Sequence, residues 1–309
     1  MLNNKNLLMS KINIKKKIKL FQSNGFVGFD NLLEIRECRK LYNILKKNRS
    51  WGRSLFISKR DKPRMNKSNP GKGIQNLVDK NNLNFIEQNP KIKKVLKEIL
   101  GNKYEIMLAK FVVAVPKSWL PKYLQVLIKK KYVSNLNSYV KKKYQDVTYF
   151  KGSDFHMDSI DWDKKSNKFI TMYIYLNDVN QSMSPLYVLK KSHSLGHLPY
   201  PHNIKDNKNS KFLEVSPDNK KFFKFKKEML IGQTGKVYFW TSNTLHGSAL
   251  SKPKKNSFRI SLRYLIKKKG KEKTLIDKML IHNKVNNTRL DSSKSTKFHV
   301  EAELRKVFI

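Results

Sequence analysis

The stretch GKVYFWTSNTLHGSALSKPKKNSFRISLRYLI, residues 235–266, carries the pattern that decides the fold. Short runs rich in β-branched and aromatic residues lie within it and before it, over 168–178, 185–189, 236–240, 243–249 and 257–266. Polar loops separate these runs, and no helical pattern alternates with them. Closely spaced strands of this kind favour an antiparallel barrel over βαβ units. We therefore predict a mainly β (α+β) fold, a double-stranded β-helix, which is a jelly-roll or cupin-like barrel with supporting helices towards its N-terminus.

The supporting helices are expected in the first third of the chain. Apolar residues recur at helical spacing over 32–47, and KIKKVLKEIL at 91–100 predicts a short helix that ends at Gly101. A strand follows over 105–116. Residues 59–83 are rich in Lys, Asn, Pro and Gly with little periodicity, so we predict a long loop there.

The segment 117–155 alternates aromatic and aliphatic residues with lysine triplets. It is interpreted either as a surface helix that packs one face on the body or as a basic amphipathic element that touches a membrane surface or an acidic substrate. We predict one domain over 1–309, made of N-terminal helical support with the first strands (20–115), a basic insertion or lid (117–155), a jelly-roll core (155–266) and a C-terminal extension (267–309).

The charge of the chain is strongly positive, with 66 Lys and Arg against 23 Asp and Glu, a formal net charge of +43. Such a balance suggests nucleic-acid binding. However, 56 of the basic residues are Lys and only 10 are Arg, and the lysine clusters are scattered along the chain. We therefore favour a solvated lysine surface over a nucleic-acid partner, while an anionic ligand could still exploit the positive electrostatic field.

Cysteine content and hydropathy indicate a cytoplasmic protein. The single cysteine, Cys38, cannot form an intramolecular disulfide or a cysteine-based zinc site. Residues 1–22 are interrupted by charges, so no signal peptide is expected, and no apolar run is long enough to predict a transmembrane segment.

The first candidate for chemistry is SDFHMDSIDWD, in which His156 and Asp158 lie two residues apart. On an extended segment this spacing directs an imidazole and a carboxylate to the same face. One such pair is a weak signal, because a histidine at the end of a strand with an acidic neighbour is common.

The second candidate lies on the two predicted strands over 243–249 and 257–266. Thr244, His246 and Ser248 share one strand face, and Arg259 and Arg263 project from the same face of the next strand. A polar stripe inside a barrel is tolerated only around a ligand or metal, and a buried guanidinium needs an anion. Two imidazoles and one carboxylate would bind Fe(II) on one face and leave sites for a bidentate co-substrate and O2. Arg263 has a simpler interpretation as a salt bridge at the end of the barrel.

Together these motifs resemble the phytanoyl-CoA dioxygenase family of Fe(II)- and 2-oxoglutarate-dependent oxygenases. The similarity covers most of the chain, and its order and spacing are more specific than any single piece. It rests on NGFVGFDNLL (24–33), ILGNKYEIML (99–108), FHMD (155–158), MYIYLNDVNQSMSPLYVLKKSHSLGH (172–197) and the stretch 235–264. The chain departs from the family's usual glycines at Ser184 and Lys191.

The resemblance implies that His156, Asp158 and His246 are iron ligands, that Arg259 binds the C5 carboxylate of 2-oxoglutarate, and that Ser248 assists. It implies an Fe(II)- and 2-oxoglutarate-dependent dioxygenase that hydroxylates a C–H bond of a small molecule, such as an anionic or CoA-linked compound, with release of succinate and CO2. A carboxylate at position 158 favours hydroxylation over halogenation, which needs a small residue there.

Two other interpretations stay open. The chain could be a catalytically silent jelly-roll module that binds nucleic acid or an anionic glycan or lipid through its lysines, or an oxygenase whose substrate is a nucleic-acid base. His193 is expected to be structural, and His197 and His202 to be loop residues and not ligands. We expect Trp162 and Trp240 to pack in the core or at the rim.

Overall fold

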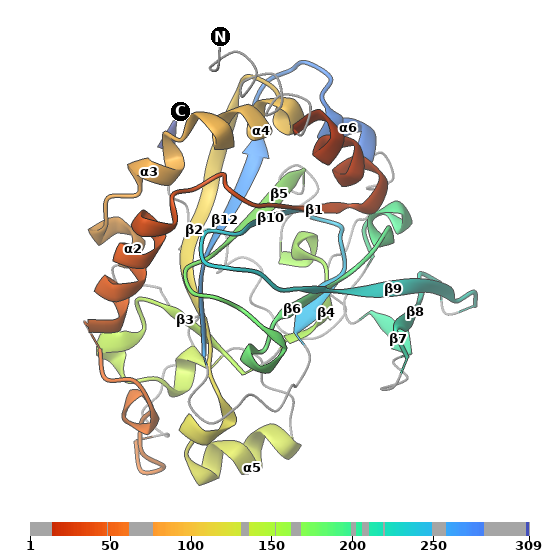
Figure 1. The fold of residues 1–309 in the computed structure, drawn as a ribbon. Helices are drawn as coiled ribbons and strands as arrows, with labels where there is room; N and C mark the ends of the chain where they lie inside the picture. The colour runs from red at the N-terminus through yellow and green to blue at the C-terminus, as the bar shows by residue number, and fades with distance from the viewer. Residues whose placement is uncertain are drawn as a thin grey trace.

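The computed structural model describes residues 14–47, 49–61, 77–130, 136–151, 153–161, 168–198, 202–205, 210–218, 220–248, 258–280 and 307–308. Two curled β-sheets dominate this part of the chain (Figure 1). All strand pairs in them are antiparallel except the parallel pair of β2 and β3. The arrangement confirms the predicted jelly-roll fold.

The major sheet is built from the most apolar strands of the sequence. Its strand order is β1 (Phe26–Phe29), β10 (Val237–Thr241), β5 (Phe169–Tyr175), β12 (Arg259–Lys268), β2 (Tyr104–Ala114) and β13 (Val307–Phe308), with β3 (Thr148–Phe150) paired to β2. Every residue of β5 and β10 is buried. Such continuous burial requires both faces of these strands to be covered.

The minor sheet is shorter and more polar. Its strand order is β4 (Ser153–His156), β11 (His246–Ser248), β6 (Leu186–Leu189), β9 (Phe223–Leu230), β8 (Phe212–Ser216) and β7 (Asn203–Lys205). The β7, β8 and β9 end of this sheet projects away from the helices in Figure 1.

Helices pack against the major sheet, and α5 (Lys122–Lys130) lies beyond the lower ends of its strands in Figure 1. Residues 14–24 are helical, and they are followed by α2 (Ile35–Lys47), α3 (Asn84–Glu87), α4 (Pro90–Leu100), α5 and α6 (Leu275–Met279). The largest apolar cluster joins these helices to alternate residues of the sheet, such as Ile260 and Leu262 of β12. The residues between them, Arg259, Ser261 and Arg263, therefore face the space between the two sheets.

The predicted helix at 91–100 is confirmed as α4, and its ends follow local sequence rules. The Asn89 side chain accepts hydrogen bonds from the backbone N–H groups of Lys91 and Ile92, and Pro90 occupies the first turn. At the other end Gly101 adopts φ 86°, a conformation that disfavours any residue with a Cβ atom.

The predicted strand 243–249 is longer than the observed one. Residues 242–245 form a tight turn instead, in which the N–H of Thr244 donates to the carbonyl of Thr241 (2.9 Å). The Thr244 hydroxyl donates to the carbonyl of Gly25 (2.7 Å), so Thr244 does not share the stripe of His246 and Ser248. Pattern alone overestimated the strand because β-propensity does not report where a turn begins.

Three further expectations concern segments that the structure describes only in part. Residues 62–76 of the predicted loop, 281–306 of the C-terminal extension, and Trp162 lie outside the described residues. Within 117–155 the chain forms α5, short 3-10 turns, β3 and most of β4. No helix among the described residues is long and apolar enough to cross a membrane.

Candidate metal centre

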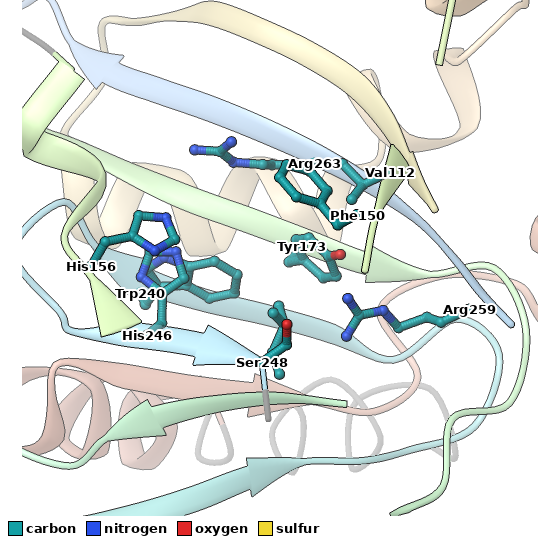
Figure 2. Close-up of a pocket in the computed structure, with 10 residues that line it drawn as sticks. Val112, Phe150, His156, Tyr173, Trp240, His246, Ser248, Arg259 and Arg263 are labelled. Carbon is teal, nitrogen blue, oxygen red and sulfur yellow. The ribbon is translucent and has the colours of Figure 1, made fainter. Parts of the chain in front are cut away.

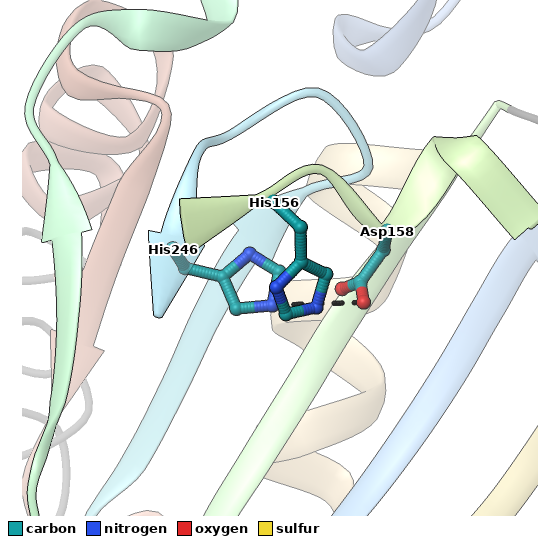
Figure 3. A group of neighbouring side chains, drawn as sticks. All are labelled: His156, Asp158 and His246. Atoms are coloured by element: carbon teal, nitrogen blue, oxygen red, sulfur yellow. Dashed lines mark ion pairs between the residues drawn. The ribbon is translucent and has the colours of Figure 1, made fainter. Parts of the chain in front are cut away.

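Three side chains from three different elements converge between the sheets (Figure 3). His156 is the last residue of β4, His246 is the first residue of β11, and the antiparallel register pairs them directly. Asp158 begins the 3-10 turn Asp158–Asp161 that follows β4. Their potential ligand atoms all lie within 4.8 Å of one another, and the two imidazole centroids are 4.5 Å apart.

The Asp158 carboxylate is buried, with 3% of its surface exposed, and is hydrogen-bonded on both oxygens. The Thr171 hydroxyl and the Trp240 indole N–H donate to Oδ2 at 2.6 and 3.1 Å. The Arg263 guanidinium donates to Oδ1 at 2.5 Å, and His246 Nε2 lies 3.6 Å from the same oxygen. Oδ2 is thus held by the wall of the barrel, while Oδ1 faces the histidines.

These contacts keep the carboxylate ionised. Burial alone would raise the pKa of Asp158, but the Arg263 guanidinium, the two imidazoles and the Thr171 hydroxyl together lower that pKa well below its usual range. Asp158 therefore carries a negative charge across the physiological pH range.

His246 is held as a neutral ligand. Its Nδ1–H donates to the carbonyl oxygen of Thr244 (3.0 Å), which leaves the Nε2 lone pair directed at Asp158 and His156. Burial lowers the pKa of His246 to about 4, against a smaller opposing effect of the Asp158 charge. Metal ligands must be neutral imidazoles, so this environment suits metal binding.

At the far end of the same pocket lies Arg259, which is 2% exposed (Figure 2). Its Nε and Nη1 atoms have no hydrogen-bond partner among the described residues. The guanidinium carbon sits 5.6 Å from the ring centroid of Tyr173, and Ser248 lines the pocket nearby. A buried cation with unsatisfied donors is costly, and an anion at this end of the pocket could satisfy those donors.

Sequence reasoning named the converging residues but missed the groups that hold them. The structure brings His156, Asp158, His246, Ser248, Arg259 and Arg263 to one pocket or its immediate wall. Thr171 and Trp240 were not expected to touch the carboxylate; Trp240 was expected only to pack. Their alternation on β5 and β10 could have indicated that both face the interior, although not which group they contact.

The remaining predicted histidines lie outside the triad. His193 Nε2 contacts the carbonyl oxygen of Gln22 (3.2 Å), and His197 Nδ1 contacts the hydroxyl of Ser159 (2.8 Å). His202 Nε2 accepts a hydrogen bond from the backbone N–H of Met157 (3.2 Å). None of the three is in the His156, Asp158 and His246 group.

Comparison with known proteins supports the fold. No family model and no curated protein matches the sequence. Among solved structures, the non-heme alpha ketoglutarate dependent epimerase SnoN from nogalamycin biosynthesis is 11% identical, with 84% of each chain covered and a TM-score of 0.51. EctD from S. alaskensis with bound Fe is 10% identical over 94% of this chain and 86% of its own, with a TM-score of 0.48. The likeness to SnoN shows a shared fold.

Proposed function

We propose that this protein is an Fe(II)- and 2-oxoglutarate-dependent dioxygenase of the phytanoyl-CoA dioxygenase type. In this proposal His156, Asp158 and His246 hold the iron, Arg259 binds the far carboxylate of 2-oxoglutarate, and Ser248 assists. The substrate is a small molecule that is hydroxylated at a C–H bond, with release of succinate and CO2. One observation carries the proposal: a triad of two imidazoles and one carboxylate lies beside a pocket that also holds a buried guanidinium with two unsatisfied nitrogens.

The residues fit both groups. Two imidazole nitrogens and one carboxylate oxygen are the donor set of non-heme Fe(II) sites that keep open positions. The unsatisfied Nε and Nη1 of Arg259 match a carboxylate, which can accept two parallel hydrogen bonds from a guanidinium. When bound, Fe(II) and 2-oxoglutarate would supply the electrons that activate O2 for oxidation of a C–H bond.

The chain's own contribution is orientation. Thr171 and Trp240 occupy Oδ2 of Asp158, so that Oδ1 is the oxygen presented to a metal. The Thr244 carbonyl fixes the tautomer and the ring plane of His246. Arg259 sets the direction from which a dicarboxylate enters, because its cationic end can be neutralised only by an anion that reaches the bottom of the pocket.

The fold comparison is compatible with this chemistry. SnoN, which shares the fold, is described as alpha ketoglutarate dependent and non-heme. It is also described as an epimerase, so the fold itself does not choose the outcome of the reaction. Hydroxylation is proposed here because a carboxylate, and not a small residue, occupies position 158.

The test is an anaerobic titration with Fe(II) and then 2-oxoglutarate, followed by the visible charge-transfer band of the ternary complex. We expect the band in the wild type and in His193→Gln, which changes a histidine outside the triad, and no band in His156→Ala. An unchanged band in His156→Ala, or none in the wild type, contradicts the proposal. Salt-sensitive binding of nucleic acid without iron or 2-oxoglutarate binding would favour the silent module.

A further inference from the structure

His246 is held by the tight turn 242–245 that precedes it, through a backbone carbonyl of that turn. The Nδ1–H of His246 donates to the carbonyl oxygen of Thr244 (3.0 Å), and Thr244 is fully buried. The direction of the imidazole therefore depends on where Thr244 lies. The groups that keep Thr244 in place lie outside the ligand set of the proposed function.

Thr244 is anchored by the opening segment of the chain. Its hydroxyl donates to the carbonyl oxygen of Gly25 (2.7 Å), which is 219 residues away in the sequence. The backbone N–H of Thr241, at the start of the turn, donates to the same oxygen (3.1 Å), and the hydroxyls of Thr241 and Thr244 lie 2.9 Å apart. A single carbonyl of the opening segment thus ties together the start and the end of the turn that leads into His246.

Gly25 can offer this carbonyl because of its own conformation. The helix over 14–24 ends at Gly25, which has φ 80° and whose N–H donates to the carbonyl oxygen of Phe21 (2.8 Å). A Cβ atom at this position would lie 2.4 Å from His193 Nδ1 and 2.9 Å from Thr244 Oγ1, so backbone strain and crowding both disfavour a larger residue. Gly25 is therefore fitted to the turn and not only to the end of the helix.

The strand that follows Gly25 reaches the same metal centre from a second direction. Phe26 begins β1 and pairs with Trp240 of β10, and the two strands lie side by side in Figure 1. The Trp240 indole N–H donates to Oδ2 of Asp158. The opening segment thus supports a candidate histidine ligand through Thr244 and the candidate carboxylate ligand through Trp240.

We propose that Gly25 and Thr244 are positioning residues of the metal centre. The Gly25 carbonyl fixes the Thr244 side chain, and the Thr244 carbonyl fixes the imidazole of His246. The inference rests on the proposed function and adds the opening segment to the parts of the chain that set metal affinity. Neither Gly25 nor Thr244 belongs to the group of candidate ligands. Loss of an outer partner of this kind lowers metal affinity by about 10- to 100-fold.

The first test compares two substitutions of Thr244 by calorimetric titration with Co(II), a redox-stable substitute for Fe(II). Thr244→Val keeps the shape of the side chain but removes its hydrogen bond to Gly25, so we expect Co(II) to bind about tenfold more weakly. Thr244→Ser keeps the hydroxyl, so its Co(II) affinity should lie within about twofold of the wild type. Equal affinities of Thr244→Val and the wild type overturn the positioning role.

The second test compares two glycines that share a backbone conformation. Gly101, at the end of α4, has φ 86°, and a Cβ atom there would lie 2.4 Å from an oxygen of Glu272, away from the residues that line the pocket. Gly25→Ala and Gly101→Ala should both lower the temperature of thermal unfolding, but only Gly25→Ala should weaken Co(II) binding, by about tenfold. Equal weakening in both variants would assign the effect to lost stability and contradict the proposal.

The third test observes His246 in the absence of metal. NMR spectra of the protein with ¹⁵N-labelled histidine report the Nδ1–H of His246, whose signal is assigned by its absence from His246→Gln. We expect slow exchange of this proton with water in the wild type and in Thr244→Ser, because the N–H is buried and hydrogen-bonded. In Thr244→Val and Gly25→Ala the exchange should be at least about fivefold faster. Unchanged exchange in both of these variants overturns the proposal.

The positioning role and the proposed function fail in distinguishable ways. A wild-type protein that binds no Co(II) contradicts the proposed function, while the exchange of the His246 proton still decides the positioning role. A protein that binds Co(II), with Thr244→Val equal to the wild type in affinity and in proton exchange, contradicts only the positioning role. Thermal unfolding of each variant shows whether a lost signal reflects a lost fold.

Discussion

At one end of the pocket the Asp158 carboxylate accepts hydrogen bonds from three side chains, whereas at the other end two nitrogens of the equally buried Arg259 have no partner. The two residues are similarly excluded from water, so burial does not explain the difference. A group whose bonds are complete is preorganised by the protein, and a group whose bonds are missing is completed by a ligand. The Asp158 end is therefore prepared before anything binds, while the Arg259 end is stable only at a cost.

The largest effect is expected when a ligand of the prepared end is removed. His246→Ala deletes one of three donors and should weaken Co(II) binding by more than about a thousandfold, because two remaining ligands cannot fill the site. Calorimetric titration measures the affinity. Wild-type affinity in this variant would show that the metal, if any, binds elsewhere.

Low pH should lower the free energy of unfolding of the protein, because the same histidine becomes protonated. The pKa of His246 is about 4 in the folded protein and near 6.5 in the unfolded chain, so the unfolded chain takes up the proton first as the pH falls. The contribution of neutral His246 to the free energy of unfolding is complete above pH 6.5. It is lost between pH 6.5 and 4, and the loss reaches about 3 kcal/mol.

Urea unfolding of the metal-free protein at several pH values measures this loss. The His246→Gln variant should show a shallower decline of its unfolding free energy over the same window. His197, whose pKa burial also lowers to about 4, remains in both proteins and cancels in the comparison. Identical pH profiles for the two proteins would contradict the assigned role of His246.

Substitution of Arg259 should weaken 2-oxoglutarate binding but increase the stability of the ligand-free protein. Arg259→Met removes the anion partner and should weaken 2-oxoglutarate binding about a hundredfold. Because it also removes unpaired buried donors, it should raise the free energy of unfolding of the ligand-free protein by about 1–2 kcal/mol. Calorimetry and urea unfolding measure the two changes, and a variant that loses both binding and stability would mean that Arg259 is satisfied in the free protein.

A smaller effect is expected from a group that only orients a ligand. Thr171→Val keeps the shape of the side chain but removes one hydrogen bond to Oδ2 of Asp158, so Co(II) affinity should fall about tenfold. The 2-oxoglutarate affinity of the metal-loaded protein should change less than in Arg259→Met. If only the 2-oxoglutarate affinity changed, Thr171 would act at the Arg259 end of the pocket and not through Asp158.

Much of this fold could be predicted because its elements are encoded locally. The helix α4 has its cap, its proline and its terminal glycine within a dozen residues, and β5, β10 and β12 carry the apolar runs expected of buried strands. The turn at 242–245 could not be predicted, because it depends on a hydrogen bond from Thr244 to Gly25, more than 200 residues away in the chain.

Alternation along a strand indicated which candidate side chains share a face, and the family resemblance then singled out His156, Asp158, His246 and Arg259. The surroundings of these side chains could not be predicted. Whether all nitrogens of Arg259 would find a hydrogen-bond partner, and whether Arg263 would meet solvent or Asp158, depends on which strands lie beside each other in the two sheets. Residue order sets the direction of a side chain relative to its own strand, but the distance between two charges far apart in the chain exists only after the sheets have closed around them.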